Sequence, residues 1–404
     1  MLAAMQDVPH QPQVIIVGAG PAGLTAAIAC AAAGVPSLLI GQAPADNRTT
    51  ALLAGSVTAL QTLGVWQRCE EHAAPLRTMR LVDDTGRLLR APEVKFDSGE
   101  IGLEAFGWNI ENRHLIAALN ARARELPSLT VIDARVDAIQ PGTRAVTVGF
   151  NGESLSASLV IGADGRKSAC RAAAGIETET HSYPQSALTL SFTHTRPHRD
   201  TSTEFHTASG PFTLVPLPGN RSSLVWVVNP AEAETIGALI DDELSVELER
   251  RSQSILGKIG VEPGRGLFPL TMSRARSFAA RRVALVGEAA HVLPPIGAQG
   301  LNLGLRDAAA IGELAAEAWQ SSRDPGGDNV LAEYDRVRRA DVGSRALAVD
   351  LLNRSLLSDF LPLQGARGFG LYLLDRIGPL RRAVMREGTA PAQGQPKLMR
   401  GEVL

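Results

Sequence analysis

The sequence predicts an α/β fold: a parallel-sheet domain of the nucleotide-binding type, interrupted by an antiparallel sheet and followed by a helical segment. Residues 14–40 have the pattern of a buried strand, a glycine-rich turn, a helix and a second strand. Two further strands, at residues 159–162 and 282–286, run into similar turns. Between them, residues 186–228 form short alternating segments separated by proline and glycine. Together these three observations predict a sheet domain inserted into a Rossmann-like one.

The composition is that of an ordinary globular protein. The 404 residues include 40 Lys and Arg against 42 Asp and Glu, which is a formal net charge of −2, and 45% are hydrophobic. These values exclude a disordered chain and give no reason to expect nucleic-acid binding, which needs a basic domain or stripe. The length predicts two or three domains. Cys30, Cys69 and Cys170 are too widely spaced for a disulfide framework or a metal cluster, so we expect buried thiols in a reducing cytoplasm.

No targeting or membrane-spanning signal stands out. Residues 1–13 lack a basic start and a sustained apolar run, which argues against a secretory signal. The most apolar stretch, residues 24–40, is interrupted by Gly34 and Pro36 and falls short of the ~20 apolar residues of a spanning helix. We therefore expect a cytoplasmic protein, either soluble or peripheral on the inner face of the membrane.

The first motif is typical of a dinucleotide site. The strand at residues 14–17 leads into Gly18, Gly20 and Gly23, and an alanine-rich helix follows to about Ala33. Glycines permit a tight turn, close approach of a pyrophosphate and close helix–strand packing, while the start of the helix favours negative charge. The acidic residue expected after the second strand is missing, but Gln42 can still hydrogen-bond a ribose.

Two later strand ends carry related turns. Residues 159–165 end in Asp164 and Gly165, and residues 282–291 contain Gly287 and Glu288, followed by a glycine-rich loop and a helix. Three such turns spread over the chain indicate one extended ligand held at several points. A nicotinamide dehydrogenase normally needs only the first.

These motifs resemble the FAD-dependent aromatic monooxygenases with the p-hydroxybenzoate-hydroxylase-like fold, and most closely the ubiquinone-biosynthesis ring hydroxylases. The likeness runs from about Pro12 to Glu387, and residues 48–52, 111–113 and 299–307 carry the closer resemblance. It implies a Rossmann-like FAD-binding domain with an inserted antiparallel-sheet substrate domain and a C-terminal helical segment. It also implies FAD as cofactor, NAD(P)H as reductant and O2 as co-substrate, with oxygen transferred from a flavin C4a-hydroperoxide.

The resemblance also implies which residues bind the cofactor. No catalytic side chain and no metal site are expected, because the flavin carries the chemistry. Arg171 is equally explained as a surface charge, and His291 is expected to support the loop. The predicted FAD-binding residues are Gly18, Gly20, Gly23, Gln42, Arg48, Arg113, Asp164, Gly287, Glu288, Gln299, Gly300, Leu301 and Asn302.

Two departures from the family pattern concern the flavin end. Glu288 stands where the family has Asp, and the next loop reads Pro294-Pro295 and Gly297-Ala298 in place of the usual His-Pro and Ala/Gly-Gly pairs. Glu288 keeps the charge and acceptor atoms, so FAD binding is expected with shifted geometry.

The motifs divide the chain into interleaved parts. We assign residues 12–82, 106–182 and 272–345 to the FAD-binding domain, and residues 83–105 and 183–271 to the substrate domain, which includes a long helical stretch at 232–259. Residues 346–388 form the C-terminal helical segment, and residues 389–404, rich in Pro, Gly and Gln, a flexible tail. Arg367, Arg376, Arg381, Arg382 and Arg386 lie among apolar residues there, which is the pattern either of a membrane-surface helix or of a helix pair packed on the core.

The predicted function is hydroxylation of an aromatic ring, most specifically of a prenylated phenol in ubiquinone biosynthesis. Two alternatives stay open: a flavin hydroxylase of a soluble aromatic compound, and a non-catalytic FAD-binding subunit of a quinone-synthesis complex. The partners implied are an aromatic substrate and possible membrane or complex contacts, with no nucleic acid.

Overall fold

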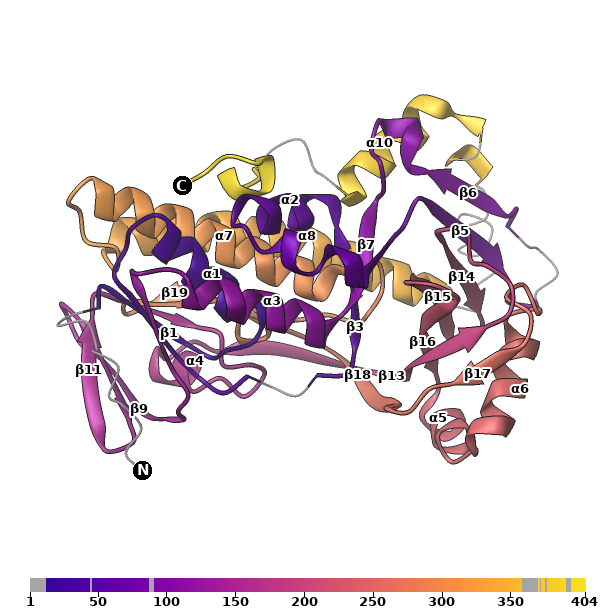
Figure 1. Cartoon of the computed structure of the whole chain (residues 1–404), viewed down its shortest axis with the longest axis horizontal. Coiled ribbons are helices and arrows are strands. Elements are labelled where there is room, and N and C mark those ends of the chain that lie inside the picture. Colours follow the sequence, from indigo (N-terminus) through magenta and orange to yellow (C-terminus); the bar gives the residue numbers. More distant parts are fainter. Residues whose placement is uncertain are drawn as a thin grey trace.

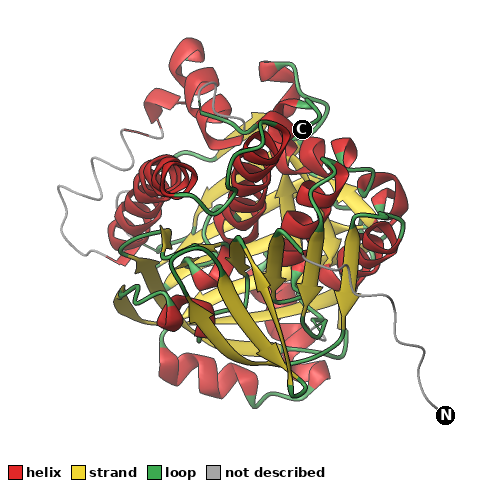
Figure 2. Ribbon diagram, turned by 90° about the vertical axis from the view of Figure 1, so that its left-hand side faces the viewer, coloured by secondary structure: helices red, strands yellow, loops and turns green. Residues whose placement is uncertain are grey.

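A computed structural model describes residues 12–43, 46–86, 91–357, 370, 372–374, 376–389 and 394–404 (Figure 1). It contains a parallel-sheet domain at one end of an elongated molecule and an antiparallel-sheet domain at the other (Figure 1). Strands form the middle of the structure, with helices on both sides of them (Figure 2). This confirms the α/β fold with an inserted antiparallel sheet.

The first domain is built on a six-stranded sheet in the order β19-β20-β12-β1-β2-β8, in which only β19 runs antiparallel. All four residues of β1 are buried, because strands lie on both of its edges and helices cover the sheet. The strands that carry the three motifs, β1, β12 and β20, are neighbours. The bounds are β1 Val14–Val17, β2 Ser37–Ile40, β8 Leu129–Ile132, β12 Leu159–Gly162, β19 Ala279–Ala280 and β20 Val283–Leu285.

Helices α1, α3 and α7 pack together against this sheet (Figure 1). Small residues bring α1 and α7 together: a Cβ on Gly312 of α7 would lie 2.7 Å from the Cβ of Ala29 on α1. The short helix α4 lies beside a three-stranded antiparallel sheet, β11-β10-β9. The bounds are α1 Pro21–Ala32, α3 Asn112–Arg124, α4 Ala169–Ala173, α7 Gln299–Gln320, β9 Val136–Pro141, β10 Val146–Phe150 and β11 Glu153–Ala157.

The second domain is a nine-stranded sheet in the order β21-β18-β13-β16-β15-β14-β5-β6, with β17 paired to β13. One face packs against helices α5 and α6 through a core that includes Leu224, Trp226, Leu244 and Leu248. The bounds are β5 Thr78–Asp83, β6 Val94–Asp97, β13 Thr178–His194, β14 Thr201–Thr207, β15 Gly210–Leu217, β16 Arg221–Val228, β17 Ile259–Val261, β18 Gly266–Ala275, β21 His291–Val292, α5 Pro230–Gly237 and α6 Asp241–Arg251.

The expected helical stretch at 232–259 is wrong in part, because it contains two helices with a break. The first, α5, starts at the Asn229 cap, whose side chain accepts from the Glu232 N–H, and ends near Gly237. Three acidic residues then begin α6, where they face the positive end of the helix dipole. After Gly257, with φ +74°, the chain returns to the sheet as β17.

A small sheet and two further helices connect the domains. The sheet has the order β3-β7-β4 and leads into α2 and α3. Helix α8 continues without a break past Asn353, where a separate helix pair was expected; residues 358–369 of that expectation lie outside the described part. The bounds are β3 Thr49–Leu53, β4 Ala73–Pro75, β7 Gly107–Glu111, α2 Ala54–Thr62, α8 Asp328–Leu357 and α10 Gly378–Thr389. Short 3-10 turns lie at Trp66–Arg68, Glu70–His72, Ser98–Ile101, Gly287–Ala289 and Lys397–Arg400.

The prediction of a flexible tail is wrong for residues 394–404, which pack on the first domain. Leu398 and Met399 are buried, at 1% and 5% exposure. The Lys397 N–H donates to Glu313 on α7, and its Nζ lies 2.6 Å from Oε1 of Glu317. Two apolar side chains and an ion pair offset the ordering cost that the Pro- and Gly-rich composition suggested.

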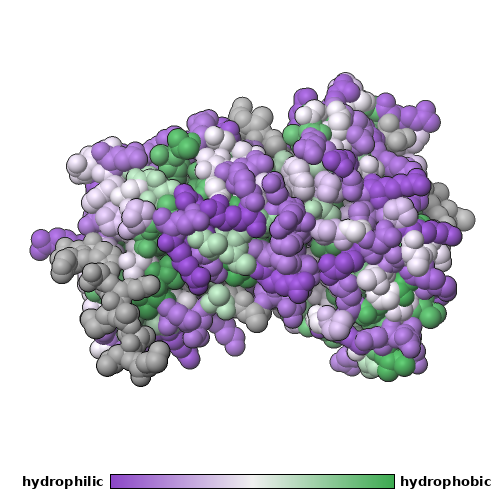
Figure 3. Space-filling model, in the orientation of Figure 1, coloured by the Kyte–Doolittle hydropathy of each residue, from purple (hydrophilic) through white to green (hydrophobic). Residues whose placement is uncertain are grey.

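Most of the surface seen in Figure 3 is hydrophilic, with hydrophobic residues in small groups. Within the described residues, no helix has a stretch both long and apolar enough to cross a bilayer.

Candidate active site

The three motif turns meet at one edge of the parallel sheet. Val14–Val17, Leu159–Gly162 and Val283–Leu285 run parallel in adjacent positions, so the turns that follow them emerge at the same, carboxyl end of the sheet. The crevice at the carboxyl ends of parallel strands is where open α/β sheets bind ligands. The arrangement brings three segments distant in sequence to one edge of the sheet, where one extended molecule could reach all of them.

Gly18 and Gly23 are required by packing. Gly18 has φ +110°, and a Cβ there would lie 2.3 Å from the carbonyl oxygen of Ala163. A Cβ on Gly23 would lie 2.0 Å from the carbonyl oxygen of Gly18. These two glycines let the first and second motif turns pass each other in direct contact.

Gly20 is different, because the space above it is open. It is the N-cap of α1, makes no side-chain capping bond, and a Cβ there would have no atom within 4 Å. The first N–H groups of a helix lack partners inside the helix and attract phosphate. Gly20 therefore leaves room for a pyrophosphate to reach the start of α1.

A pocket of about 370 Å³ continues from this turn along the ends of β2 and β8. Its lining includes Ala19, Gly41, Asn120 and Asp133. Gln42, predicted for the ribose, is exposed next to Gly41. The pocket suits the adenosine half of a dinucleotide, and its carboxylate comes from Asp133, one residue after β8. Sequence reasoning missed Asp133 because it looked for an acidic residue only after β2.

Arg48 lies near the third motif but has a partner of its own. Its Nε and Nη2 lie 2.8 and 2.7 Å from the two carboxylate oxygens of Asp46, which also accepts from Asn112. The hydrogen bond from Arg48 to Asp46 raises the pKa of this guanidinium, and the negative charge of Glu288 adds to the rise. The Arg48 side chain is 49% exposed, so it remains accessible to a ligand.

Arg113 is less well placed than predicted. It lies at the start of α3 with its side chain 58% exposed, and its Nη2 is 3.0 Å from both oxygens of Glu111. Within the described part of the chain its side-chain hydrogen bonds go to Glu111 and His114, outside the three motif turns. The neighbouring Asn112 holds the segment around Arg48 instead, because it donates to Asp46 and accepts from Thr50 Oγ1 at 2.6 Å.

Asp164 uses both oxygens within its own turn. Oδ1 accepts from Ser168 Oγ at 2.6 Å and Oδ2 from the Cys170 N–H at 3.0 Å, so the carboxylate holds the start of α4. Arg171 donates to the carbonyls of Ala289 and Arg166, at 2.7 and 2.8 Å. Arg171 is therefore a tie between the second and third motifs rather than a free surface charge.

Glu288 projects at the opening of the site. Its carboxylate is 46% exposed and lies 3.2–3.3 Å from Nη2 and Nε of Arg166, which follows the Asp164 turn. The preceding Gly287 has φ +60°, a conformation that favours glycine. The positive charges of Arg48 and Arg166 thus lie near the negative charge of Glu288, although the three residues belong to separate segments.

The start of α7 faces β3. Ala298, at φ 55°, is the N-cap, Gln299 bonds back to the Gly297 carbonyl, and Gly300 has open space around it. Asn302 is 2% exposed; it accepts from the Leu53 N–H and donates to the carbonyls of Ala51 and Ala298. Leu301 is half-buried. Asn302 therefore fixes β3 against α7, while the backbone at Gly300 stays open to a ligand.

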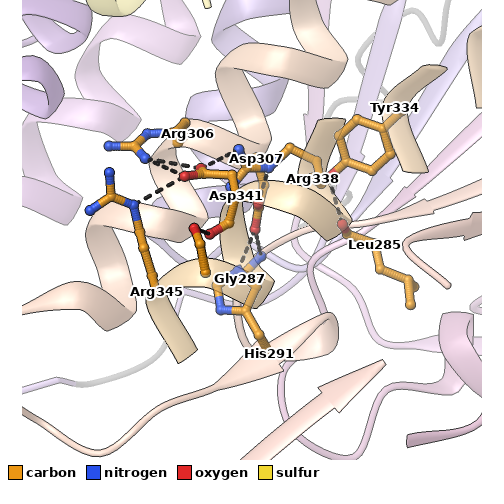
Figure 4. Close-up of polar contacts among 10 residues, drawn as sticks. Leu285, Gly287, His291, Arg306, Asp307, Tyr334, Arg338, Asp341 and Arg345 are labelled. Atoms are coloured by element: carbon orange, nitrogen blue, oxygen red, sulfur yellow. Dashed lines mark hydrogen bonds and ion pairs between the residues drawn. The ribbon is translucent and has the colours of Figure 1, made fainter. Parts of the chain in front are cut away.

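A buried charged cluster lies beneath the third turn (Figure 4). His291, expected to be structural, is 2% exposed, and its Nε2 is 2.6 Å from Oδ2 of Asp307. Asp307 also pairs with Arg338 of α8. Burial would raise the pKa of Asp307, but the charges of His291 and Arg338 outweigh it and hold that pKa below its usual value. Sequence reasoning missed Arg338, which no local pattern distinguishes from the other arginines of α8.

The described residues contain no group of three His, Cys, Asp or Glu side chains that could hold a metal ion. The three cysteines are free and buried, as predicted. Burial raises the pKa of the Cys30 thiol to about 12, so this thiol stays protonated.

The donor set fits a flavin dinucleotide. The adenosine-sized pocket at the ends of β2 and β8, the open helix start at Gly20 after β1 and the half-exposed Glu288 after β20 follow one another along the sheet edge. Their order suits the adenosine, pyrophosphate and ribityl parts of FAD, with the antiparallel sheet beyond. The fold and this site define a protein that binds FAD at the carboxyl ends of its parallel strands.

Comparison with known proteins agrees with this class and shows the activity, that of an FAD-dependent monooxygenase of aromatic rings. Residues 11–348 match the model of the FAD binding domain family, and the chain belongs to that family. A ubiquinone hydroxylase of Rhodospirillum rubrum, UbiL, is 36% identical over 401 residues, covering 96% of this chain and 92% of that protein. The 3-demethoxyubiquinol 3-hydroxylase of Escherichia coli is 30% identical over 390 residues, covering 93% of this chain and 98% of that protein.

Solved structures share the fold. The p-nitrophenol 4-monooxygenase PnpA of Pseudomonas putida superposes with a TM-score of 0.77 at 19% identity, covering 95% of this chain and 99% of that one. HpxO of Klebsiella pneumoniae, solved with FAD and uric acid, gives a TM-score of 0.74 at 21% identity, covering 96% and 98%.

Proposed function

We propose that this monooxygenase hydroxylates the ring of a prenylated phenol in ubiquinone biosynthesis, with NAD(P)H as reductant. The observation that carries the proposal is similarity along nearly the whole chain to two proteins named as hydroxylases of ubiquinone or its precursor, at 36% and 30% identity. Overall, ring C–H, O2, NAD(P)H and a proton give ring C–OH, NAD(P)+ and water.

When bound, FAD would supply the redox chemistry, which is the transfer of electrons from NAD(P)H to O2 for ring hydroxylation. The chain's own residues bind and orient the cofactor. In this proposal the backbone at Gly20 holds the pyrophosphate, and Asp133 and Gln42 hold the ribose of the adenosine half. Glu288, Arg48 and Arg166 face the ribityl part, and the open backbone at Gly300 faces the flavin ring, where N–H groups stabilise negative charge.

The sheet face directed toward the FAD-binding domain is suited to a partly apolar substrate. The Asn109 amide of β7 donates to Ser223 Oγ of β16, which shows that this face of β16 is turned toward β7. Strand alternation places Val225 and Val227 on the same face. Val227 packs with Tyr183 and Leu270, whereas Trp226 points into the opposite core. Val225, Val227 and Leu270 make this face partly aliphatic, which suits the prenyl tail of the proposed substrate.

Quinone profiling of a strain that lacks this protein tests the proposed substrate. We expect an under-hydroxylated prenyl-phenol to accumulate, and re-expression of the protein to restore the mature quinone. An unchanged quinone pool contradicts the proposal.

Assays with purified, FAD-loaded protein separate the alternatives. NAD(P)H oxidation coupled to hydroxylation of a small soluble phenol, with none of a prenylated phenol, supports the soluble-aromatic alternative. No substrate-dependent NAD(P)H oxidation with either compound supports the non-catalytic subunit.

We also propose that α10 contacts an anionic membrane surface, where a prenylated substrate resides. One side of α10 is docked: Arg381 pairs with Glu100 and lies over the Phe96 ring, and Met385 is buried in the same cluster. The apolar side chains of Ile377, Leu380 and Val384 are 42%, 41% and 46% exposed. Their spacing of three and four residues forms a stripe along the helix, and the exposed Arg376, Arg382 and Arg386 add positive charge.

Vesicle co-flotation tests this contact. The wild-type protein is expected to float with vesicles that contain phosphatidylglycerol and to remain behind with pure phosphatidylcholine. The double substitution Leu380→Ser and Val384→Ser should abolish flotation, since about 2 kcal/mol or more of apolar transfer energy is lost. Val246→Ser, at a 64% exposed position on α6, is the matched control and should float normally. Equal flotation of both variants would refute the contact.

A further inference from the structure

The buried cluster beneath the third turn is organised around Asp307 (Figure 4). This carboxylate is fully buried and receives three donors. Oδ2 accepts from the Gly287 N–H at 3.0 Å and lies 2.6 Å from His291 Nε2, while Oδ1 lies 2.6 Å from Arg338 Nε. One side chain therefore connects α7, α8 and the turn that carries Glu288.

That turn is held in place on several sides. A Cβ added to Gly287 would lie 3.2 Å from the Cβ of Ala22 on α1, and one added to Gly304 of α7 would lie 3.1 Å from the Gly287 Cα. The hydrogen bond that Asp307 accepts from the Gly287 N–H fixes the direction of that N–H group. With its backbone held this way, Glu288 projects toward Arg166 at the opening of the site.

The far side of the cluster anchors Asp307 to α8. Arg338 pairs through Nη1 with Asp341 at 2.7 Å, and Asp341 also pairs with Arg306 and Arg345. The Tyr334 hydroxyl, one turn before Arg338, donates to the Leu285 carbonyl of β20 at 2.7 Å. Contacts of α8 with α7 and with β20 thus hold Asp307 in position for its hydrogen bond with the Gly287 N–H.

The cluster is not arranged for stability alone. Within the described residues, His291 Nδ1, Arg306 Nε and Arg338 Nη2 are buried without a hydrogen-bond partner. Such groups cost free energy, and buried ion pairs are often replaceable by apolar side chains without loss of stability. The hydrogen bond between Asp307 and the Gly287 N–H indicates a second role for the cluster, which is to position the turn that carries Glu288.

We propose that Asp307 is a positioning residue for FAD, which sets the direction of the Glu288 carboxylate through the Gly287 N–H. The inference rests on the proposed contact between Glu288 and the ribityl part of FAD. It predicts that the bond to the turn governs cofactor affinity, whereas the ion pairs farther along the cluster govern only stability.

Asp307→Asn tests this directly, because an amide has one acceptor oxygen and one donor group. The single amide oxygen can accept either from the Gly287 N–H and His291 or from Arg338, but it cannot serve both groups of donors. We expect the FAD dissociation constant, measured by quenching of flavin fluorescence, to rise about tenfold or more. The visible circular dichroism of the residual bound flavin should also change, since its surroundings are reoriented.

Asp341→Asn is the matched control. Asp341 belongs to the same cluster but, among the described residues, its side chain bonds only arginines. We expect a lower melting temperature with FAD affinity within twofold of the wild type. Asp307→Asn with wild-type affinity, or equal loss of affinity in both variants, overturns the inference.

Two outcomes keep the inference separate from the function and from folding. If the Glu288→Gln variant binds FAD with wild-type affinity, the ribityl contact is refuted, but the role of Asp307 in holding the turn is not. Where Asp307→Asn does not fold, His291→Leu removes one donor from Asp307 and should raise the FAD dissociation constant to a smaller extent. No change in that variant also overturns the inference.

Discussion

Gly18→Ala is expected to abolish folding of the FAD-binding domain. The alanine Cβ would lie 2.3 Å from the Ala163 carbonyl oxygen, at the contact between the first and second motif turns. The nearest atoms, which belong to Ala163 and Asp164, are all backbone atoms, so no side chain can move aside. The φ of +110° adds a conformational penalty of about 1–3 kcal/mol. Soluble yield and the thermal melting curve measure the effect.

Gly20→Ala, two residues away, is the control for this substitution. Gly20 has φ −75° and ψ 173°, which alanine adopts readily, and a Cβ there meets no atom within 4 Å. Alanine is a poorer N-cap than glycine, and the replacement costs about 0.5–1 kcal/mol. We expect a melting temperature of the apoprotein only slightly below that of the wild type but a clear loss of FAD affinity, because the methyl group stands where a phosphate approaches. A well-folded Gly18→Ala protein would contradict the packing argument.

Arg338→Met is expected to be the most destabilising substitution of a side chain in the buried cluster. Arg338 is 2% exposed and neutralises Asp307 and Asp341, both at 2.6–2.7 Å. Removing one partner of a buried ion pair costs about 3–5 kcal/mol, because a charge is left buried without compensation. The midpoint of urea unfolding and the melting temperature measure this loss.

The loss should depend on pH in a defined direction. Although burial would raise the pKa of Asp341, the charges of Arg338 and Arg306 hold it well below its usual value. A carboxyl group with a lowered folded-state pKa contributes stability above its unfolded pKa of about 3.9, and that contribution is lost as the pH falls. The difference between wild type and Arg338→Met is therefore largest at neutral pH and shrinks below about pH 4.

Arg336→Met is the control on the same helix. Arg336 is paired with Glu333 three residues earlier, and both side chains are largely exposed. Exposed pairs of this kind contribute little to stability. We expect an unchanged melting temperature, and a loss comparable to that of Arg338→Met would show that helix α8 itself, rather than the buried cluster, is sensitive to substitution.

Local patterns were sufficient for the elements of the parallel sheet. The apolar run at 14–17 is short and β-branched, the glycines follow directly, and an alanine-rich stretch predicts the helix. Parallel strands have their carboxyl ends on one side, so the meeting of three turns could be predicted without knowing the strand order. The antiparallel strands followed from alternation, although the sequence pattern placed the start of β13 eight residues too late, at 186 rather than 178.

Contacts between distant segments could not be predicted in this way. Asn302 bonds a backbone group 249 residues earlier in the chain, and Asp307 meets Arg338 from another helix. Neither partner carries a local signal, since an arginine in a helix is usually exposed. Asp133 at the ribose end and the packing of Leu398 and Met399 depend equally on which strands and helices become neighbours.

The sequence by itself determined the dinucleotide-binding fold, because glycine turns after buried strands obey local steric rules that any fold must satisfy. Only the tertiary structure decided which charges surround the flavin turn, and which of the predicted residues are free to meet a ligand. Glu288 and Gly20 remain open, whereas Asp164 and Asn302 are engaged within the protein. The physical reason is that a hydrogen bond or ion pair depends on distance in space, and periodicity along the chain constrains that distance only between near neighbours.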